Sequence, residues 1–480
     1  MDIIVLSEVN IKNQNKRKGG KMYHRLLRNI LVLLVITGLI FTAIGCSGKT
    51  ATSSTTTTST TATTTAVTTS KTTSSTTTAI TTYTTSTTTP SGNVSYTDAD
   101  VAYTPYTGNF DRTWTFYCIE PMSGSASVYG INDVLGTKHA VNDMNAMGGL
   151  LINGIRYKIA YQVLDSKYDS ATAAQIAQQV VLQNNGKFVH LTGTAPTLGC
   201  EDFLAQSNVF DMTSALSSPL VVGTKWPLQF AYNPQPVDYG PSTFYPWVVS
   251  NLGVKTVAMA NPDSDNGRVF SNAVKNAIKL YNIPVTLLSD AFYTPGTQDF
   301  SPLINKLMAL NPDMIDLAGS SPGDTALCVK QIREKGYKGI TANLVTQGDP
   351  ATMWSVAGAS ATGHYTIGLS GDPTPAFAYF RKIIEKETGQ PLYVSPPYSY
   401  EQNLVSFMAM NQANTFDPYK IAAVQQDMKW NILYGPCSYI GGTPGSIFAL
   451  KRVNCVTESL LQVTTNGQAK IVVTIAYPGT

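Results

Sequence analysis

Apolar and polar positions form a regular pattern over residues 113–149. The apolar run Trp114–Ile119 predicts a buried β-strand. A small polar loop, Met122–Ser125, follows, and apolar residues then recur at helical spacing until the pair Gly148–Gly149 ends the helix. A strand that leads through a short loop into a helix is the first half of a βαβ unit. Because ligands bind at the carboxyl ends of strands in open α/β sheets, this loop is expected to form one wall of a ligand site.

Strand and helix patterns then alternate along the chain in two series. In the first series the strands end in loops of Ser, Thr and small residues at 193–197 and 213–218, and in the second they end at 261–267 and 319–323. The expected strands lie at 155–164, 188–192, 209–212, 256–260, 285–288, 314–317 and 340–345, and the expected helices at 170–182, 241–252, 268–281, 300–310 and 324–335. This alternation predicts parallel sheets with right-handed crossovers. Residues 110–480 are too many to share one small hydrophobic core, so we expect two lobes.

The N-terminal part of the chain predicts export rather than a fold. Basic residues precede the apolar run Ile30–Ile44, whose 15 residues are short for a bilayer span of about 20. A basic region, an apolar region and small residues before a cut site form an export signal. The cysteine at the cut, Cys46, resembles that of a bacterial lipoprotein signal, which predicts lipidation there. A plain membrane-anchor helix is the alternative, and either Met1 or Met22 is the true start.

Residues 46–109 predict a lipidated, disordered tether. Thr50–Thr89 is almost entirely Thr and Ser, so it cannot bury enough apolar surface to offset the entropy of ordering. A wall-spanning or adhesive stalk is the alternative. Residues 1–45 hold seven Lys or Arg and two acids, so the net charge of +3 becomes about −2 without them. No basic stripe remains to bind nucleic acid.

The residue types that carry catalysis or hold metals are few and scattered. The chain has 6 Cys and 4 His, with no CxxC pair, no HExxH and no metal-ligand spacing. Neither a nucleophile elbow nor a P-loop is present. Cys437 and Cys455 could bridge a loop in an exported protein. We therefore expect no enzyme activity, no cofactor and no metal.

Several segments, in their order and spacing, resemble the type I periplasmic binding proteins. The resemblance is to the branched-chain amino-acid (leucine/isoleucine/valine) binding family that serves ABC importers, and it runs from Asp111 to the C-terminus. It implies two Rossmann-like α/β lobes with parallel sheets, joined by a three-segment hinge. The segments that carry it are MSGSASVYG, NDMNAMGG, LDSKYDSATAA, NPDSDNG and REKGYKG.

The resemblance also implies a division of the chain. Three segments are expected to cross between the lobes, near Tyr232–Asp238, His364–Ser370 and Tyr439–Leu450. The implied parts are a lipoprotein signal peptide at 1–45, the tether at 46–109, lobe 1 at 110–235, lobe 2 at 236–367, a returning part of lobe 1 at 368–445 and the last strands of lobe 2 at 446–480.

Motif positions in this family carry over to five residues of the first lobe. Ser123 and Tyr129 come from the first loop and helix, Thr194 from the loop after the third strand, and Ala215 and Ser217 from the next loop. In the family these positions hold a ligand carboxylate. The chemistry fits, because a desolvated carboxylate needs hydroxyl and N–H donors, and the N-termini of helices supply them. Each hydroxyl could instead form a turn with its own backbone.

The second lobe departs from the family pattern. The amino-acid binders use aromatic residues and a carboxylate that pairs with the ligand ammonium. The corresponding positions here are Asn266, Ser320 and roughly Val345, none of which is acidic or aromatic. A shift in the alignment leaves three nearby acids open for that role, namely Asp263, Asp265 and Asp349.

Together these features predict an exported, lipid-anchored binding protein on the outer face of the cell membrane. We expect a monomer that captures an amino acid or a related small polar or carboxylate solute between its lobes and delivers it to the permease and ATPase subunits of an ABC importer. The alternative is a ligand-sensing or adhesive surface lipoprotein with the same fold and no transporter.

Overall fold

The structure, a computed structural model, describes the globular part of the chain. The predicted signal, the predicted lipidation site Cys46 and the predicted tether up to residue 105 lie outside it, as do Ser217 and Cys455. Within the part described, no helix is both long and apolar enough to cross a membrane. The described residues are 106–216, 223–232, 237–442, 450–454 and 457–475.

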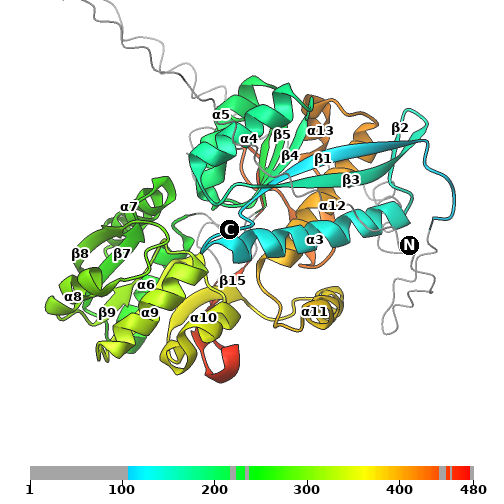
Figure 1. Cartoon of the computed structure of the whole chain (residues 1–480). Coiled ribbons are helices and arrows are strands. Elements are labelled where there is room, and N and C mark those ends of the chain that lie inside the picture. The colour runs from blue at the N-terminus through cyan, green and yellow to red at the C-terminus, as the bar shows by residue number, and fades with distance from the viewer. Residues whose placement is uncertain (1–105, 217–222, 233–236, 443–449, 455–456, 476–480) are drawn as a thin grey trace, which may run out of the picture. The chain divides into compact units, whose positions relative to one another are not determined.

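Two seven-stranded sheets form the framework (Figure 1). The first has the order β14-β6-β5-β4-β1-β3-β2 and the second β16-β15-β11-β10-β9-β7-β8. Neighbouring strands are parallel except that β2 is antiparallel to β3, and β15 is antiparallel to both β11 and β16. The predicted α/β fold with two mostly parallel sheets is confirmed.

The bounds of the strands and helices are as follows. The first sheet contains β1 (Arg112–Glu120), β2 (Leu150–Ile152), β3 (Ile155–Asp165), β4 (Phe188–Leu191), β5 (Phe210–Thr213), β6 (Gln229–Tyr232) and β14 (Val453–Asn454). The second contains β7 (Thr256–Pro262), β8 (Thr286–Tyr293), β9 (Met314–Asp316), β10 (Ile340–Gln347), β11 (Tyr365–Leu369), β15 (Glu458–Val463) and β16 (Ala469–Thr474). A separate hairpin pairs β12 (Lys429–Asn431) with β13 (Pro436–Ser438). The α-helices are α3 (Ser127–Ala146), α4 (Ser170–Leu182), α5 (Thr194–Gln206), α6 (Tyr239–Leu252), α7 (Asp265–Leu280), α8 (Ser301–Ala309), α9 (Pro322–Glu334), α10 (Pro350–Ala357), α11 (Pro375–Thr388), α12 (Ser395–Ala413) and α13 (Pro418–Gln425).

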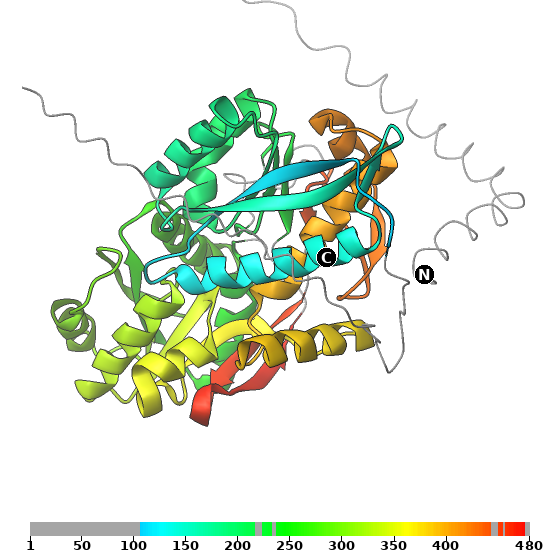
Figure 2. The same cartoon turned by 45° about the vertical axis from the view of Figure 1, so that its right-hand side comes forward.

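Alternation along β1 builds a core on each face of the first sheet. Phe116 and Cys118 are buried in a cluster with side chains of α3 and α12, whereas Tyr117 and Ile119 belong to a second cluster with α4 and α5. Successive side chains of a strand point to opposite faces, so one apolar run supplies both cores. Figure 2 shows α3 running alongside β1 and β3.

The second sheet follows the same plan. On β7, Val257 and Met259 are buried with residues of α6 and α7, while Ala258 and Ala260 are buried with residues of α8, α9 and α10. Covering helices on both faces account for the near-continuous apolar runs of these strands, which are typical of parallel sheets.

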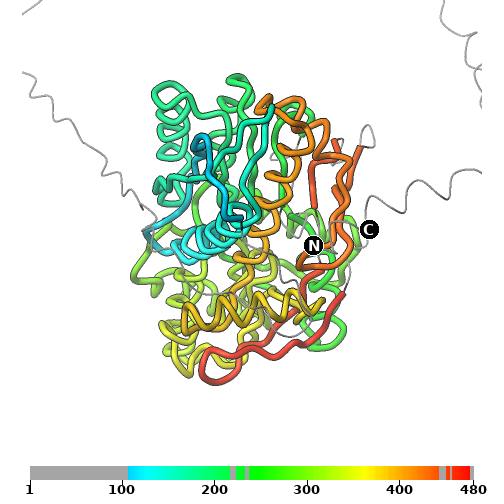
Figure 3. The backbone as a smooth tube through the Cα atoms, turned by 90° about the vertical axis from the view of Figure 1, so that its right-hand side faces the viewer, coloured from blue at the N-terminus to red at the C-terminus, as the bar shows by residue number. Residues whose placement is uncertain are grey.

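The chain passes between the two sheets three times, as the order of the strands shows. In Figure 3 the C-terminal strands β15 and β16, in red, lie beside the green and yellow elements of the second lobe. The first passage lies between β6 and α6, and the second between β11 and α11. The third follows β14, whose Val453 and Asn454 pair with β6 of the first sheet. From the sequence we expect this crossing at 439–450 and the lobe boundary at 446. Both positions precede β14, a strand of the first sheet that is too short for hydrophobic periodicity to reveal.

Candidate functional site

A cavity of about 40 Å³ lies at the carboxyl ends of strands from both sheets. Four parts of the chain line it. The loops after first-lobe strands, with the start of α5, contribute Tyr168, Thr192, Gly193, Thr194, Ser214 and Leu216, α3 contributes Tyr129, the start of α12 contributes Val394, Ser395 and Tyr398, and the second lobe contributes Phe270, Thr346 and Gln347. This is the edge at which open α/β sheets bind ligands.

Two of the expected site residues line the cavity. Thr194 is 1% exposed, and it is the first residue of α5 rather than part of a loop. Its Oγ1 accepts a hydrogen bond of 3.3 Å from the N–H of Leu216. Tyr129 projects from α3, and its hydroxyl donates to the backbone carbonyl of Gln347 in the second lobe at 3.4 Å.

Ser123 and Ala215 do not line the cavity. Ser123 is exposed, and its hydroxyl donates to Oδ2 of Asp165 at 2.6 Å, so it forms the turn after β1. Ala215 is fully buried, and its N–H donates to Oγ1 of Thr213 at 3.0 Å. Its neighbours Ser214 and Leu216 line the cavity instead. Ser217 lies outside the described residues, so its role stays a prediction.

The expected second-lobe residues are also placed away from the lining. Asn266 is 3% exposed and accepts from the Ser264 hydroxyl at 2.8 Å, and Ser320 is 1% exposed and bonded to the Tyr293 hydroxyl at 2.7 Å. Val345 is buried in the sheet core. The three alternative acids serve structure: Asp263 pairs with Arg268, Asp265 accepts from Ser170 at 3.2 Å, and Asp349 caps α10.

Aromatic side chains supply much of the wall. Tyr129, Tyr168, Tyr398 and Phe270 all line the cavity, and the rings of Tyr129 and Tyr168 are 5.9 Å apart. Among the described residues, the lining contains no Lys, Arg, His, Asp or Glu side chain. Tyr168 lies in the segment LDSKYDS, which carried part of the resemblance, and it has a positive φ of 59°. A bulky residue held in this uncommon backbone conformation often marks a functional position.

A buried carboxylate, Asp133 of α3, supports the first-lobe wall. Its Oδ2 accepts hydrogen bonds from the hydroxyls of Thr192 and Ser214, the latter at 2.7 Å. Asp133 is fully buried. Desolvation and then the charge of Glu120 raise its pKa, while the charge of His190 and the hydrogen bonds of Thr192 and Ser214 lower it, and the net result is a pKa of about 6. Asp133 lies mid-helix, where an acid has no motif to mark it, so the sequence did not reveal it.

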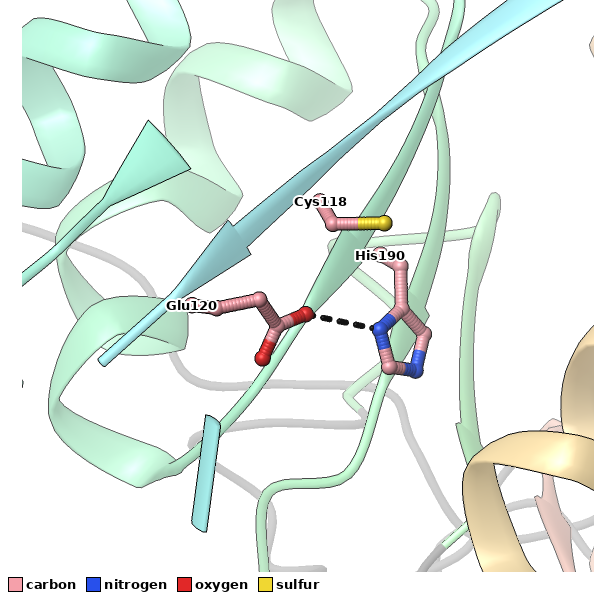
Figure 4. A group of neighbouring side chains, drawn as sticks. All are labelled: Cys118, Glu120 and His190. Carbon is pink, nitrogen blue, oxygen red and sulfur yellow. Dashed lines mark hydrogen bonds and ion pairs between the residues drawn. The ribbon is translucent and has the colours of Figure 1, made fainter. Parts of the chain in front are cut away.

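His190 lies next to this carboxylate and carries both ring protons. Its Nδ1 is 2.9 Å from Oε1 of Glu120 (Figure 4). Its Nε2 is 3.0 Å from Oε1 of Gln402. The amide nitrogen of Gln402 donates to the carbonyls of Thr213 and Phe230, which fixes the amide oxygen toward the imidazole. Both ring nitrogens therefore donate. Desolvation lowers the pKa of His190, but the bond and charge of Glu120 raise it above its ordinary value overall.

Cys118, Glu120 and His190 form the one metal-ligand grouping among the described residues, with ligand atoms within 4.8 Å of one another. A metal needs a lone pair on an imidazole nitrogen, but hydrogen bonds occupy both nitrogens of His190. Burial and the charge of Glu120 also raise the pKa of the Cys118 thiol well above its ordinary value, which disfavours the thiolate. The residues fit a buried ion pair better than a metal centre.

A second buried carboxylate lies behind the lining on the other side. Glu458 begins β15 and is fully buried. Its Oε1 accepts from the hydroxyl of Tyr398 at 2.7 Å and from the amide of Gln347 at 3.4 Å. Desolvation raises its pKa to about 7. It adjoins the third crossing, a place that only the tertiary fold connects to the cavity.

Residues 118–447 match the periplasmic binding protein family. The chain belongs to this family. Its relatives include the Leu/Ile/Val-binding protein of Escherichia coli K12, 26% identical over 325 residues that cover 66% of this chain and 84% of the relative. Another is the Leu/Ile/Val/Thr-binding protein of Salmonella typhimurium, 25% identical with the same coverage.

Solved structures agree on the fold. A leucine-binding protein of Thermotoga maritima superposes with a TM-score of 0.66 at 19% identity, covering 76% of this chain and 99% of the other. A branched-chain amino acid transporter substrate-binding protein of Streptococcus pneumoniae, solved with isoleucine, gives a TM-score of 0.64 at 17% identity, covering 76% and 99%. The relatives are binding proteins, so this member of the family is a binding protein and not an enzyme.

Proposed function

We propose that this chain is the extracytoplasmic, lipid-anchored binding protein of an ABC importer, and that it captures an amino acid or a related small polar solute. The observation that carries this proposal is the cavity at the carboxyl ends of both sheets, with walls from both lobes. The named relatives favour transport over a sensory or adhesive role. A neighbour from R. palustris, solved with benzoate, widens the range of candidate solutes.

Contacts between the lobes support capture by closure. The N–H of Gly323 in α9 donates to the carbonyl of Ser125 in the first lobe at 3.1 Å, and Ser170 donates to Asp265 at 3.2 Å. A solute that touches both walls favours the closed arrangement, because it binds that arrangement more tightly than an open one.

A thermal-shift screen tests solute binding directly. The panel contains amino acids, their amides, aromatic acids and short peptides. Binding to the folded state alone raises Tm, with a stabilisation that grows as the logarithm of solute concentration. No response to any solute in the panel would contradict the proposed function.

A cavity-filling variant locates the binding site. Ser395 is half-buried in the lining, so Ser395→Trp should place an indole in the cavity and abolish the shift. Ser355→Trp is the matched control, because Ser355 is exposed on α10 and away from the cavity. An unchanged response of Ser395→Trp would place the solute elsewhere.

Lipid anchoring has its own test. Cys46→Ala should release the protein from the membrane fraction into the soluble extracytoplasmic fraction, while the unaltered chain carries a lipid adduct at Cys46 detectable by mass spectrometry. Retention of the variant in the membrane would instead favour an uncleaved anchor helix.

A further inference from the structure

We infer, on the basis of the proposed function, that the cavity selects solutes by a positively charged amine or ammonium group, which faces the wall formed by Thr192, Ser214 and the surrounding aromatic rings. The family resemblance places a carboxylate against first-lobe hydroxyls, whereas the hydroxyls of Thr192 and Ser214 in the first-lobe wall of this chain already donate to Asp133.

Five of the eight lining hydroxyls already donate their protons to protein acceptors. Because a hydroxyl has one proton and two lone pairs, a hydroxyl that donates into the protein can only accept from a solute. Five lining hydroxyls are in this state: Tyr129 donates to the Gln347 carbonyl, Thr192 and Ser214 to Asp133, Thr346 to Asn343 and Tyr398 to Glu458.

The charged groups behind the lining also favour a cation. Asp133 and Glu458 are both fully buried, and each is one hydrogen bond from the cavity. The imidazolium of His190 balances Glu120, with which it is paired at 2.9 Å, so the negative charge of Asp133 is left over. Asp133 Oδ1 and Glu458 Oε2 have no hydrogen-bond partner among the described residues. A cation in the cavity would be attracted to these carboxylates, and a solute carboxylate would be repelled.

The aromatic walls favour the same solute. The rings of Tyr129 and Tyr168 are 5.9 Å apart and tilted by 36°, and Tyr398 and Phe270 complete the lining. The faces of aromatic rings attract cations, most strongly where water is excluded. This attraction needs no N–H group, so protonated amines and quaternary ammonium ions both satisfy the wall.

Isosteric probes of different charge test the inference on the unaltered protein. Leucinol keeps the ammonium of leucine without its carboxylate, and 4-methylpentanoate keeps the carboxylate without the ammonium. Choline and its neutral isostere 3,3-dimethylbutan-1-ol make the same comparison for a quaternary ion. We expect each cation to bind at least ~30-fold more tightly than its uncharged or anionic counterpart, measured by calorimetry and thermal shift.

The responses to the two cations also distinguish two kinds of contact by which the wall could recognise positive charge. A response to leucinol alone identifies a protonated amine that donates to the lone pairs of Thr192 and Ser214. A response to choline alone identifies the aromatic faces as the dominant contact. Tighter binding of 4-methylpentanoate than of leucinol, or detectable binding of choline that its neutral isostere equals, would overturn the inference.

Failure of this inference differs from failure of the proposed function. If a panel solute binds but neither cation does, the inference is wrong and the binding function stands. If nothing in the panel or the probe set binds, the binding function itself is wrong.

A charge-removing variant assigns the selectivity to its carboxylate. Asp133→Asn should weaken leucinol or choline binding at least ~10-fold and leave 3,3-dimethylbutan-1-ol unaffected. Asp427→Asn is the matched control, since Asp427 is exposed and pairs with Lys451 away from the cavity. Glu458→Gln repeats the test from the other wall, and the probe comparison on the unaltered protein decides the matter if either variant fails to fold. Unchanged cation affinity in both folded variants would contradict the inference.

Discussion

At the scale of single residues, the buried ionisable groups around the cavity differ in whether they are paired. Glu120 and His190 neutralise each other through a direct contact of 2.9 Å, so the desolvation cost of each is partly offset. Among the described residues, Asp133 accepts from the neutral hydroxyls of Thr192 and Ser214, and its pKa is raised, chiefly by burial, to about 6. The Glu120–His190 pair holds the wall in place, while Asp133, which lies behind the hydroxyls, is available to respond to a solute.

Removing one member of the buried pair should expose this difference. His190→Gln leaves Glu120 without its cation beside Asp133, so we expect a loss of unfolding free energy of ~3–5 kcal/mol, measured by urea denaturation. His139→Gln is the control, because His139 contacts Glu387 at 2.9 Å near the surface and should cost less than ~1 kcal/mol. Equal losses in the two variants would mean that the buried contact carries no charge.

Residue-level prediction from the sequence was uneven for a physical reason. Tyr129 and Thr194 reached the cavity because a strand end and a helix start fix the position of a side chain. Ser123 and Asn266 follow equally suggestive strand ends, yet Ser123 donates to Asp165, and Asn266, in the first turn of α7, accepts from Ser264. Short polar side chains compete for such local bonds, and the sequence does not show which bond wins.

At the scale of helices and strands, close approach between α3 and α12 stabilises the first lobe. Gly136 of α3 lies so near α12 that an added Cβ would meet the Ser399 hydroxyl and the Pro396 carbonyl. Glycine costs helix stability in isolation, and here it permits two helices to pack closely.

Gly136→Ala should therefore destabilise the protein even though alanine favours helices. We expect a loss of ~1–3 kcal/mol from overpacking, measured by chemical denaturation. Asn142→Ala on the same helix is exposed and should change stability by less than ~0.5 kcal/mol, in the stabilising direction. A stabilising Gly136→Ala would show that the two helices can move apart without cost.

Long periodic segments were predictable and short ones were not. Helix α4 begins as predicted after Asp169, whose carboxylate accepts from the N–H of Thr172 at 2.7 Å. The β2–β3 hairpin was not predicted, although Asn153 and Gly154 have the positive φ values of 50° and 79° that an Asn-Gly turn prefers. The three-residue strand β2 gives too short a pattern to separate from the loop after α3.

At the scale of the whole molecule, many buried carboxyl groups have raised pKa values. Desolvation raises the pKa of Asp211 and Asp316 to about 7, of Glu401 to about 8 and of Glu201 to about 9. The folded state therefore holds protons that the unfolded state releases near pH 4. Stability contributed in this way is complete below the unfolded pKa and is lost as the pH rises through the folded pKa.

The protein should accordingly be more stable in mild acid than in mild base. We expect Tm at pH 5 to exceed Tm at pH 8 by ~3 °C or more, measured by calorimetry at constant ionic strength. Asp316→Asn should reduce the slope, because it removes one of the titrating groups, whereas the exposed Asp427→Asn should not. A Tm that rises from pH 5 to pH 8 would mean that these groups ionise freely in the folded state.

The cavity is also a property of the whole chain. Gln347, Tyr398 and Glu458 meet there, although they lie on β10, α12 and β15. Local patterns predicted each element or its neighbourhood, but which residues converge depends on how three crossings bring the segments together. This explains why the sequence located the correct sheet edge yet missed most of the residues that line it.

Closure of the two lobes gives a last prediction that separates binding from stability. Gly323 donates to the Ser125 carbonyl across the lobes, and an added Cβ would lie 2.8 Å from that oxygen. Gly323→Val should hold the lobes apart and lower solute affinity ~10-fold, because only the closed fraction binds tightly. The Tm without solute should stay nearly unchanged, since neither lobe core is touched.

Glu334→Val, at the exposed end of the same helix, is the control. Small-angle scattering should show a solute-induced decrease in radius of gyration for the control and a smaller one for Gly323→Val. Full closure of Gly323→Val at unchanged affinity would mean that the contact plays no part in capture.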